Sequence, residues 1–197
     1  MNDLERRLAV LETDASAAVA AFRRRAADSG LLDVAYADLD SPMGPLSVFV
    51  TPRGLVRVAY NPAETELQDL ADRLSPRMLR APQRTDAIRR EFEEYFAGHR
   101  RAFDAPIDWS LVRGFAGAVL HATARIPFGS TSTYRELAAE AGSPNAHRAA
   151  GNALGSNPVP IVVPCHRVLR SGGGLGGYTG GLDRKRFLLR LEGALDG

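Results

Sequence analysis

The first part of the chain combines a helical pattern with an alternating one. Apolar residues recur at near-helical spacing through residues 2–29, and a stop sequence, Asp-Ser-Gly, closes this stretch. We therefore expect an N-terminal helical extension over residues 1–30 that packs on the rest of the protein. Alternating apolar and polar residues, separated by turns rich in proline and glycine, then predict an antiparallel meander with strands at residues 33–40, 46–51 and 55–61.

Helical periodicity dominates the remainder of the chain. Two helices are expected near residues 63–74 and 83–97, before a proline-containing segment at residues 101–110 that follows neither periodicity. This segment is the best candidate for a linker. We therefore expect an N-terminal α/β domain over residues 31–105 and a second domain over residues 111–197.

The second domain is expected to begin with three helices. A periodic stretch at residues 111–126 ends at Pro-Phe-Gly, and a second helix can start after Ser132 or Thr133, because both residue types are good N-caps. A third helix is expected over residues 145–155. Two short helices joined by a glycine-containing turn match a helix-turn-helix unit, although a plain helical hairpin has the same pattern.

The third of these helices consists mostly of residues with small side chains. Six of its eleven residues are alanine or glycine, namely Ala146, Ala149, Ala150, Gly151, Ala153 and Gly155. Glycine within a helix costs about 1 kcal/mol relative to alanine, so we expect something to approach this helix closely. A thin helix fits the minor groove of DNA, which is about half as wide as the major groove. Tight packing inside the domain is the alternative.

Composition and charge narrow the class of protein. The chain has 197 residues, of which 45% are hydrophobic and 24% charged, as is typical of globular domains. No stretch reaches the roughly 20 apolar residues of a membrane helix, and the N-terminus does not resemble a signal peptide, so we expect a cytoplasmic protein without membrane contact. Residues 106–197 carry ten basic and six acidic side chains, which suits a phosphate-bearing partner.

The only cysteine is the first candidate for chemistry. Cys165 excludes an internal disulfide and a multi-cysteine zinc or iron–sulfur site. Three prolines precede it, Pro158, Pro160 and Pro164, and are expected to hold the backbone extended. His166 follows and is the imidazole best placed to act as a base, since the thiolate is the reactive form. The alternative is that Cys165 is a small buried hydrophobic residue, as a lone cysteine usually is.

Two features near the C-terminus extend this picture. Residues 171–181 hold seven glycines, so the backbone there can approach a flat ligand closely. A phosphate-binding loop would need a Lys-Ser/Thr pair, which this stretch lacks, and a surface hairpin is the other interpretation. Glu192 lies among apolar and basic residues, where a carboxylate can orient a histidine or can be a simple surface charge.

These motifs together carry a strong resemblance to the O6-alkylguanine-DNA alkyltransferases. The match is close over residues 111–193, through IPFGSTSTYRELA, SPNAHRAAGNALGSNP, VPIVVPCHRV and GGYTGGLDRKRFLLRLEG, and looser over DSPMGPLSVFVTPRGLVRVAY and FEEYFAG. The resemblance implies an α+β or α/β fold. In it, an N-terminal antiparallel-sheet domain with helices, similar to ribonuclease H, precedes a C-terminal winged helix-turn-helix-like domain that binds DNA and holds the active site.

The implied function is direct-reversal DNA repair by a single-turnover transferase. An alkyl group, typically methyl, would move irreversibly from O6-alkylguanine, with O4-alkylthymine as a further substrate, to the protein's own cysteine. The partner would be double-stranded DNA bound through its minor groove. The resemblance implies a monomer and no cofactor. Some family members hold zinc in the N-terminal domain, but residues 1–110 contain only His99 and no cysteine, so no metal is expected.

The resemblance also implies roles for individual residues. Cys165 would accept the alkyl group, His166 would act as its base through a bridging water, and Glu192 would orient His166. Asn157 would join the DNA-binding helix to the reactive segment, and Tyr134 would donate a proton to the departing guanine. The remaining DNA-binding and pocket residues would be Arg148, which fills the space of the flipped base, Ala146, Ala149, Gly151, Val168, Tyr178, Thr179 and Gly180.

Other functions fit only parts of the pattern. A non-catalytic protein that binds alkylated DNA would have no use for Cys165. A helix-turn-helix regulator would leave the Pro-Cys-His-Arg sequence, Tyr134 and Glu192 without a purpose. A cysteine hydrolase would need an oxyanion-hole signature and a separately placed triad, and the sequence offers neither.

Overall fold

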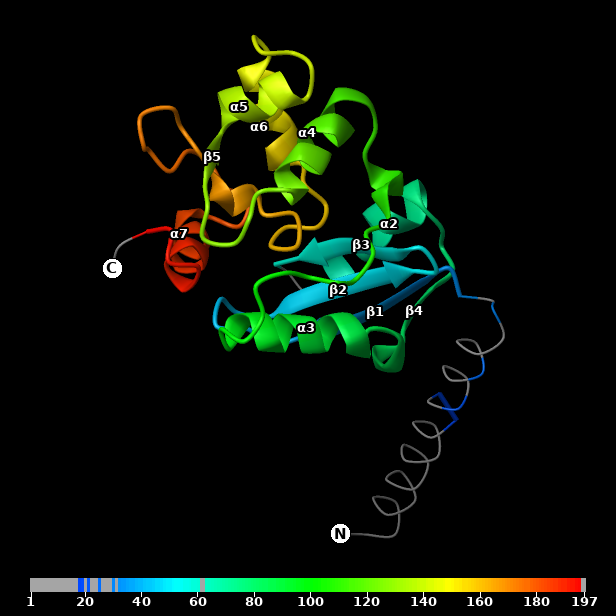
Figure 1. The fold of residues 1–197 in the computed structure, drawn as a ribbon. Coiled ribbons are helices and arrows are strands. Elements are labelled where there is room, and N and C mark those ends of the chain that lie inside the picture. Colours follow the sequence, from blue (N-terminus) through cyan, green and yellow to red (C-terminus); the bar gives the residue numbers. More distant parts are fainter. Residues whose placement is uncertain are drawn as a thin grey trace.

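A four-stranded sheet forms the N-terminal domain (Figure 1). The computed structural model describes residues 18, 19, 21, 25, 30, 32–60 and 63–195, so the expected helical extension over residues 1–30 lies almost entirely outside the described residues. The strand order is β3-β2-β1-β4. The strands and helices of this domain are β1 (Val34–Leu39), β2 (Leu46–Thr51), β3 (Gly54–Ala59), α2 (Leu67–Arg73), β4 (Met78–Arg80) and α3 (Asp86–Phe96).

The predicted meander is confirmed, and one further strand joins it. β1, β2 and β3 pair antiparallel in sequence order. β4 pairs parallel with β1, so the sheet is mixed and not purely antiparallel as expected. Because β4 has only three residues, its sequence is too short to show an alternating pattern.

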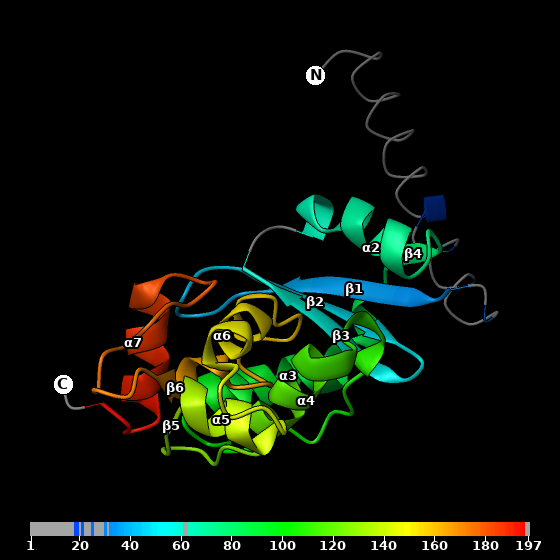
Figure 2. The ribbon, with the colours of Figure 1, turned by 90° about the horizontal axis from the view of Figure 1, so that it is seen from above.

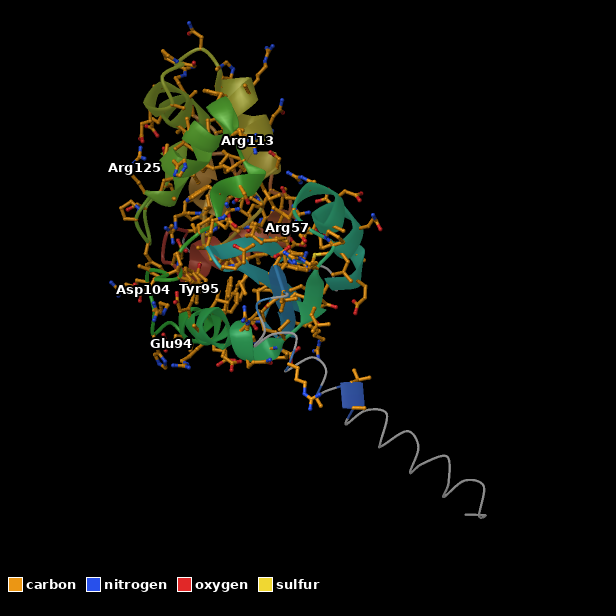
Figure 3. All side chains as sticks on the ribbon, turned by 90° about the vertical axis from the view of Figure 1, so that its right-hand side faces the viewer. Arg57, Glu94, Tyr95, Asp104, Arg113 and Arg125 are labelled. Carbon is orange, nitrogen blue, oxygen red and sulfur yellow. The ribbon has the colours of Figure 1, made fainter. Side chains whose placement is uncertain are left out.

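Helices cover both faces of the sheet, with α2 on one face and α3 on the other (Figure 2). Successive side chains of a strand point to opposite faces. On β2, Val48 accordingly belongs to the main core with Phe92 of α3, whereas Phe49 packs in a second cluster with Leu70 of α2. Arg57 of β3, labelled in Figure 3, donates a 2.8 Å hydrogen bond to Glu66 at the start of α2 and so ties this helix to the sheet.

The C-terminal domain is helical, with a small second sheet. Its helices are α4 (Gly114–Ala124), α5 (Tyr134–Glu140), α6 (His147–Gly155) and α7 (Leu182–Leu191), and its strands are β5 (Ser132–Thr133) and β6 (Val168–Leu169), which pair in parallel. Thr133 caps α5 and forms a capping box with Glu136, as its residue type predicts. α5 and α6 are the two short helices of the predicted helix-turn-helix unit.

The two domains share one continuous apolar core. Val48 and Phe92 of the sheet domain lie in the same cluster as Leu120 of α4 and Leu188 of α7. The expected linker is itself paired to the sheet, because Leu55 donates a 2.8 Å backbone hydrogen bond to Pro106. Short 3-10 helices complete the fold at η1 (Ala63–Thr65), η2 (Pro82–Arg84), η3 (Trp109–Leu111) and η4 (Cys165–Arg167). Among the described residues, no helix is both long and apolar enough to cross a membrane.

Candidate active site

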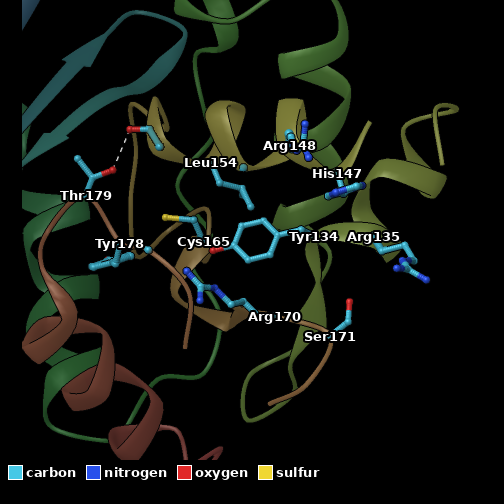
Figure 4. A pocket seen from close by; sticks show the side chains of 13 residues that line it. Tyr134, Arg135, His147, Arg148, Leu154, Cys165, Arg170, Ser171, Tyr178 and Thr179 are labelled. Atoms are coloured by element: carbon cyan, nitrogen blue, oxygen red, sulfur yellow. Dashed lines mark hydrogen bonds between the residues drawn. The ribbon is translucent and has the colours of Figure 1, made fainter. Parts of the chain in front are cut away.

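Cys165 begins the short helix η4 and lines a pocket of about 650 Å³ (Figure 4). The side chain is almost completely buried. Burial raises the pKa of the Cys165 thiol to about 11, although the hydrogen bond from Asn157 and the charge of Lys185 oppose this shift. At neutral pH the residue is therefore a protonated thiol, and a nucleophilic reaction needs a base nearby.

The segment before Cys165 folds into a tight turn, in place of the extended run that its prolines predicted. The amide of Val163 donates a 2.9 Å hydrogen bond to the carbonyl of Val159, and Ile161 between them has a φ of 76°. A β-branched residue rarely adopts this left-handed conformation. Asn157 holds the turn, because its Nδ2 donates both to the carbonyl of Val163 (2.8 Å) and to Sγ of Cys165 (3.2 Å).

Three side chains converge on the buried carboxylate of Glu192. Its Oε1 lies 2.9 Å from Nε2 of His166 and accepts a 2.6 Å hydrogen bond from the hydroxyl of Tyr95. Arg167 donates to both carboxylate oxygens, at 2.8 and 2.9 Å. Burial alone would raise the pKa of Glu192, but the hydrogen bonds from His166 and Arg167 hold it at about 2. Glu192 is therefore a carboxylate anion at neutral pH.

Burial keeps His166 neutral, and this carboxylate fixes its tautomer. Burial lowers the pKa of His166, while Glu192 opposes the shift, so the ring is neutral at pH 7. Because the Glu192 carboxylate can only accept, Nε2 carries the ring proton and Nδ1 keeps a lone pair. Nδ1 is buried and has no hydrogen-bond partner among the described residues. His166 can therefore accept a proton beside the thiol.

Tyr134, the first residue of α5, extends across the pocket toward Cys165 (Figure 4). Burial raises the pKa of its hydroxyl, so the group is a neutral proton donor at pH 7. The glycine-rich loop lies close against it. A Cβ at Gly176 would collide with the Tyr134 hydroxyl, and Gly176 also has a φ of 68°, so glycine is required there on both counts.

The small residues of α6 have two separate explanations. Ala150 and Ala153 are buried where α6 packs against α4 and α5, as the packing interpretation predicted. Ala149 is exposed, and a Cβ at Gly155 would meet nothing within 4 Å. The open face of α6 therefore has small residues at Ala149 and Gly155. Arg148 is exposed and lines the mouth of the pocket, where Figure 4 shows it on α6.

The pocket brings together most, but not all, of the residues that the sequence singled out. Besides Cys165, its lining includes Tyr134, Arg148, Gly151, Tyr178 and Thr179. Val168 and Gly180 are not part of the lining: the carbonyl of Val168 accepts a 2.6 Å hydrogen bond from Lys185, and Gly180 is buried. Ala146, the N-cap residue of α6, and Ala149 within α6 are not part of the lining.

Sequence reasoning missed several residues around the site. Lys185 is the only lysine of the chain and is fully buried, with its ammonium group donating to the carbonyls of Val168, Leu175 and Gly177. Burial lowers the pKa of Lys185 to about 8. A single lysine in a chain that otherwise uses arginine was a usable signal. Tyr95, in contrast, is 97 residues from Glu192, and no local pattern predicts that contact.

Metal ligands do not cluster in the described part of the chain. No group of three histidine, cysteine, aspartate or glutamate side chains there could hold a metal ion.

Comparison with known families assigns both domains. Residues 34–109 match the model described as "6-O-methylguanine DNA methyltransferase, ribonuclease-like domain". Residues 114–194 match the model described as "6-O-methylguanine DNA methyltransferase, DNA binding domain". The two models therefore cover the sheet domain and the helical domain in turn.

Curated relatives and solved structures agree with this assignment. A methylated-DNA–protein-cysteine methyltransferase of Methanosarcina acetivorans is 36% identical over 159 residues, which cover 81% of this chain and 98% of the relative. Its counterpart in Mycobacterium tuberculosis strain H37Rv is 37% identical over 164 residues, covering 80% and 91%. The crystal structure of Mycobacterium tuberculosis OGT in complex with DNA superposes with a TM-score of 0.69 at 36% identity, covering 81% and 93%.

Proposed function

The chain belongs to the methylated-DNA–protein-cysteine methyltransferases, and we propose that Cys165 is the cysteine that accepts the alkyl group. As a member of this family, the protein repairs alkylated DNA by direct reversal. One observation carries the assignment of Cys165: the chain's only thiol lies in the pocket, next to a buried histidine that a carboxylate holds in the proton-accepting tautomer.

The proton of the thiol has one acceptor that the geometry favours. We assign Nδ1 of His166 as the acceptor, reached through a bridging water, with Glu192 stabilising the imidazolium that forms. The thiolate of Cys165 then attacks the alkyl carbon. A carbon–sulfur bond forms as the carbon–oxygen bond breaks, and the electron pair of the broken bond passes to guanine. A proton from the Tyr134 hydroxyl neutralises the departing base.

The product of this transfer is a thioether on a buried side chain. The same His166 that activates a thiol offers no route to cleave a carbon–sulfur bond, so Cys165 does not return to its starting state. Each molecule therefore transfers one alkyl group and is consumed.

The substrate must leave the DNA stack to reach Cys165. The alkyl carbon on O6 of guanine lies inside the duplex, and extruding a base costs a few kcal/mol, less where pairing is already damaged. The pocket of about 650 Å³ has room for an extruded base. Arg148 lies at the mouth of this pocket, and we assign it to the space that the base vacates.

The open face of α6 is the surface that we assign to the minor groove. Ala149 and Gly155 are small residues on that face, and Arg148 emerges from the same helix. Leucine at position 149 should clash with the duplex and weaken binding by at least about tenfold, or about 1.4 kcal/mol. Ala124→Leu, at an exposed alanine of α4, is the matched control. Unchanged duplex affinity in a folded Ala149→Leu variant would reject minor-groove docking.

A titration to the end point tests the single-turnover function. Increasing amounts of a duplex that carries O6-methylguanine are added to a fixed amount of protein, and the remaining methylated base is counted. We expect repair to stop at one methyl group per molecule of protein. Continued turnover would contradict the proposal. Reaction with O4-alkylthymine, a monomeric state and a cytoplasmic location stay predictions from the sequence.

A further inference from the structure

Tyr178, which lines the pocket with Cys165, belongs to a glycine-rich loop. Residues 171–181 contain seven glycines, and Gly176 and Gly181 have positive φ angles. Glycine-rich backbone has many accessible conformations, so the position of such a loop depends on what anchors it. The contacts that anchor this loop therefore set the position of Tyr178 in the pocket lining.

One anchor comes from the sheet domain. The hydroxyl of Tyr60, immediately after β3, is hydrogen-bonded to the hydroxyl of Tyr178, and their ring centroids lie 6.1 Å apart. A Cβ at Gly180 would lie only 2.7 Å from the Tyr60 ring, so ring and loop backbone are in close contact. Burial raises the pKa of both tyrosines, so both hydroxyls are neutral and one donates to the other.

A second anchor comes from α7. The guanidinium of Arg184 lies 4.8 Å from the centroid of the Tyr60 ring, a cation–π distance. Arg184 also donates hydrogen bonds to the carbonyl of Gly180 (3.0 Å) and to the carbonyl of Met43 in the turn between β1 and β2 (3.1 Å). Met43, Tyr60, Tyr178, Gly180 and Arg184 thus form one set of contacts between the domains, here called the Tyr60 cluster.

We propose that Tyr60 is a specificity-determining residue that, through the Tyr60 cluster, fixes the width of the base pocket and so limits the size of the alkyl group that Cys165 accepts. Tyr60 does not line the pocket itself and acts by positioning Tyr178. This inference rests on the proposed function. It gives the sheet domain, which does not contain the nucleophile, a direct part in substrate selection.

The test compares a large and a small adduct in the same DNA. Transfer rates are measured with O6-benzylguanine and with O6-methylguanine at one position of one duplex sequence. Tyr60→Phe removes the hydroxyl and keeps the ring. We expect the benzyl-to-methyl rate ratio to rise by about fivefold, the equivalent of about 1 kcal/mol for one hydrogen bond between neutral groups. Tyr60→Ala should raise the ratio further.

Matched controls separate pocket width from general stability. Arg184→Met should raise the ratio, whereas Arg186→Met, which removes the same charge from the same helix and pairs only with Asp183 in the described contacts, should leave it unchanged. Tyr36→Phe removes a hydroxyl from the opposite face of the sheet and should also leave the ratio unchanged. Loss of stability alone lowers both rates together and does not change their ratio.

The outcomes distinguish this inference from the function on which it rests. If the wild-type protein transfers both groups and the folded Tyr60 and Arg184 variants keep the wild-type ratio, the inference is wrong and the proposed function stands. If the wild-type protein transfers neither group, both are wrong. A higher ratio in Tyr60→Phe and Arg184→Met, with unchanged controls, supports the assignment of Tyr60.

Discussion

Tyr95 donates a 2.6 Å hydrogen bond to the same oxygen of Glu192 that lies 2.9 Å from His166. Tyr95 belongs to α3 of the sheet domain, whereas His166 and Glu192 belong to the helical domain. The carboxylate that orients the proposed base is thus held from both domains. Together with Tyr60, Tyr95 makes the sheet domain part of the active site as well as its support.

Removal of the Tyr95 hydroxyl should weaken the contacts around Glu192 without leaving a cavity in the core. Phenylalanine fills almost the same volume, so Tyr95→Phe loses mainly one buried hydrogen bond to a charged group. We expect the free energy of unfolding to fall by about 1.5–3 kcal/mol. Transfer should slow by less than about tenfold, because Arg167 still holds Glu192. Urea unfolding measures the first effect, and unchanged stability would contradict it.

The role assigned to His166 predicts a change in the pH dependence of transfer. With a pKa of about 11, only about one Cys165 thiol in ten thousand ionises unaided at pH 7. In the wild-type protein His166 takes the proton, so the rate should be flat above about pH 6.5, since its pKa lies below the usual 6.5.

In His166→Gln the thiol must ionise without this base. Its rate with free O6-benzylguanine should be lower and should rise about tenfold per pH unit between about pH 7 and 9. Circular dichroism checks that the variant folds. Parallel pH profiles for the variant and the wild-type protein would exclude His166 as the base.

The lowered pKa of Glu192 predicts how the free energy of unfolding depends on pH. Its pKa is about 2 in the folded protein and 4.5 for an unperturbed glutamate, so its stabilising contribution is complete above pH 4.5 and is lost as the pH falls toward 2. The difference corresponds to about 3 kcal/mol. The lowered pKa of His166 acts in the same direction, because its stabilising contribution is lost as the pH falls below 6.5.

Urea unfolding at a series of pH values between about 5 and 2.5, roughly the window that the pKa of Glu192 sets, measures the contribution of Glu192. Glu192→Gln should flatten the acid-side decrease in the free energy of unfolding. Glu140→Gln, which removes a surface carboxylate paired with Arg125, should leave the decrease as it is in the wild-type protein. Equal decreases in the wild-type protein and Glu192→Gln would show that Glu192 does not cause the acid sensitivity.

The position of Arg148 predicts a split between two substrates. If its side chain holds the duplex open, Arg148→Ala should slow repair of O6-methylguanine in duplex DNA by at least about tenfold, the equivalent of about 1.4 kcal/mol. Free O6-benzylguanine needs no base extrusion and should react as it does with the wild-type protein. Equal losses with both substrates would place Arg148 in the pocket chemistry and reject the assigned role.

The sequence could predict the features that neighbouring residues determine. Alternation in β1 to β3 and the Thr133 cap of α5 are local, and the structure confirms both. The turn around Ile161 was missed because prolines indicate extended backbone and give no sign of a left-handed residue among them. Contacts of Tyr95, Tyr60 and Lys185 depend on how distant segments pack, and no periodicity along the chain reports such contacts.

The central claim, that Cys165 takes the alkyl group, has one direct measurement. The protein is incubated with duplex DNA that carries O6-methylguanine, and the tryptic peptide that contains residue 165 is weighed and fragmented. We predict a peptide heavier by one methylene, with the added mass on Cys165, and no such peptide from Cys165→Ser, which should still fold and bind DNA. A methyl group on another residue, or loss of the DNA methyl with Cys165 unmodified, would contradict the account.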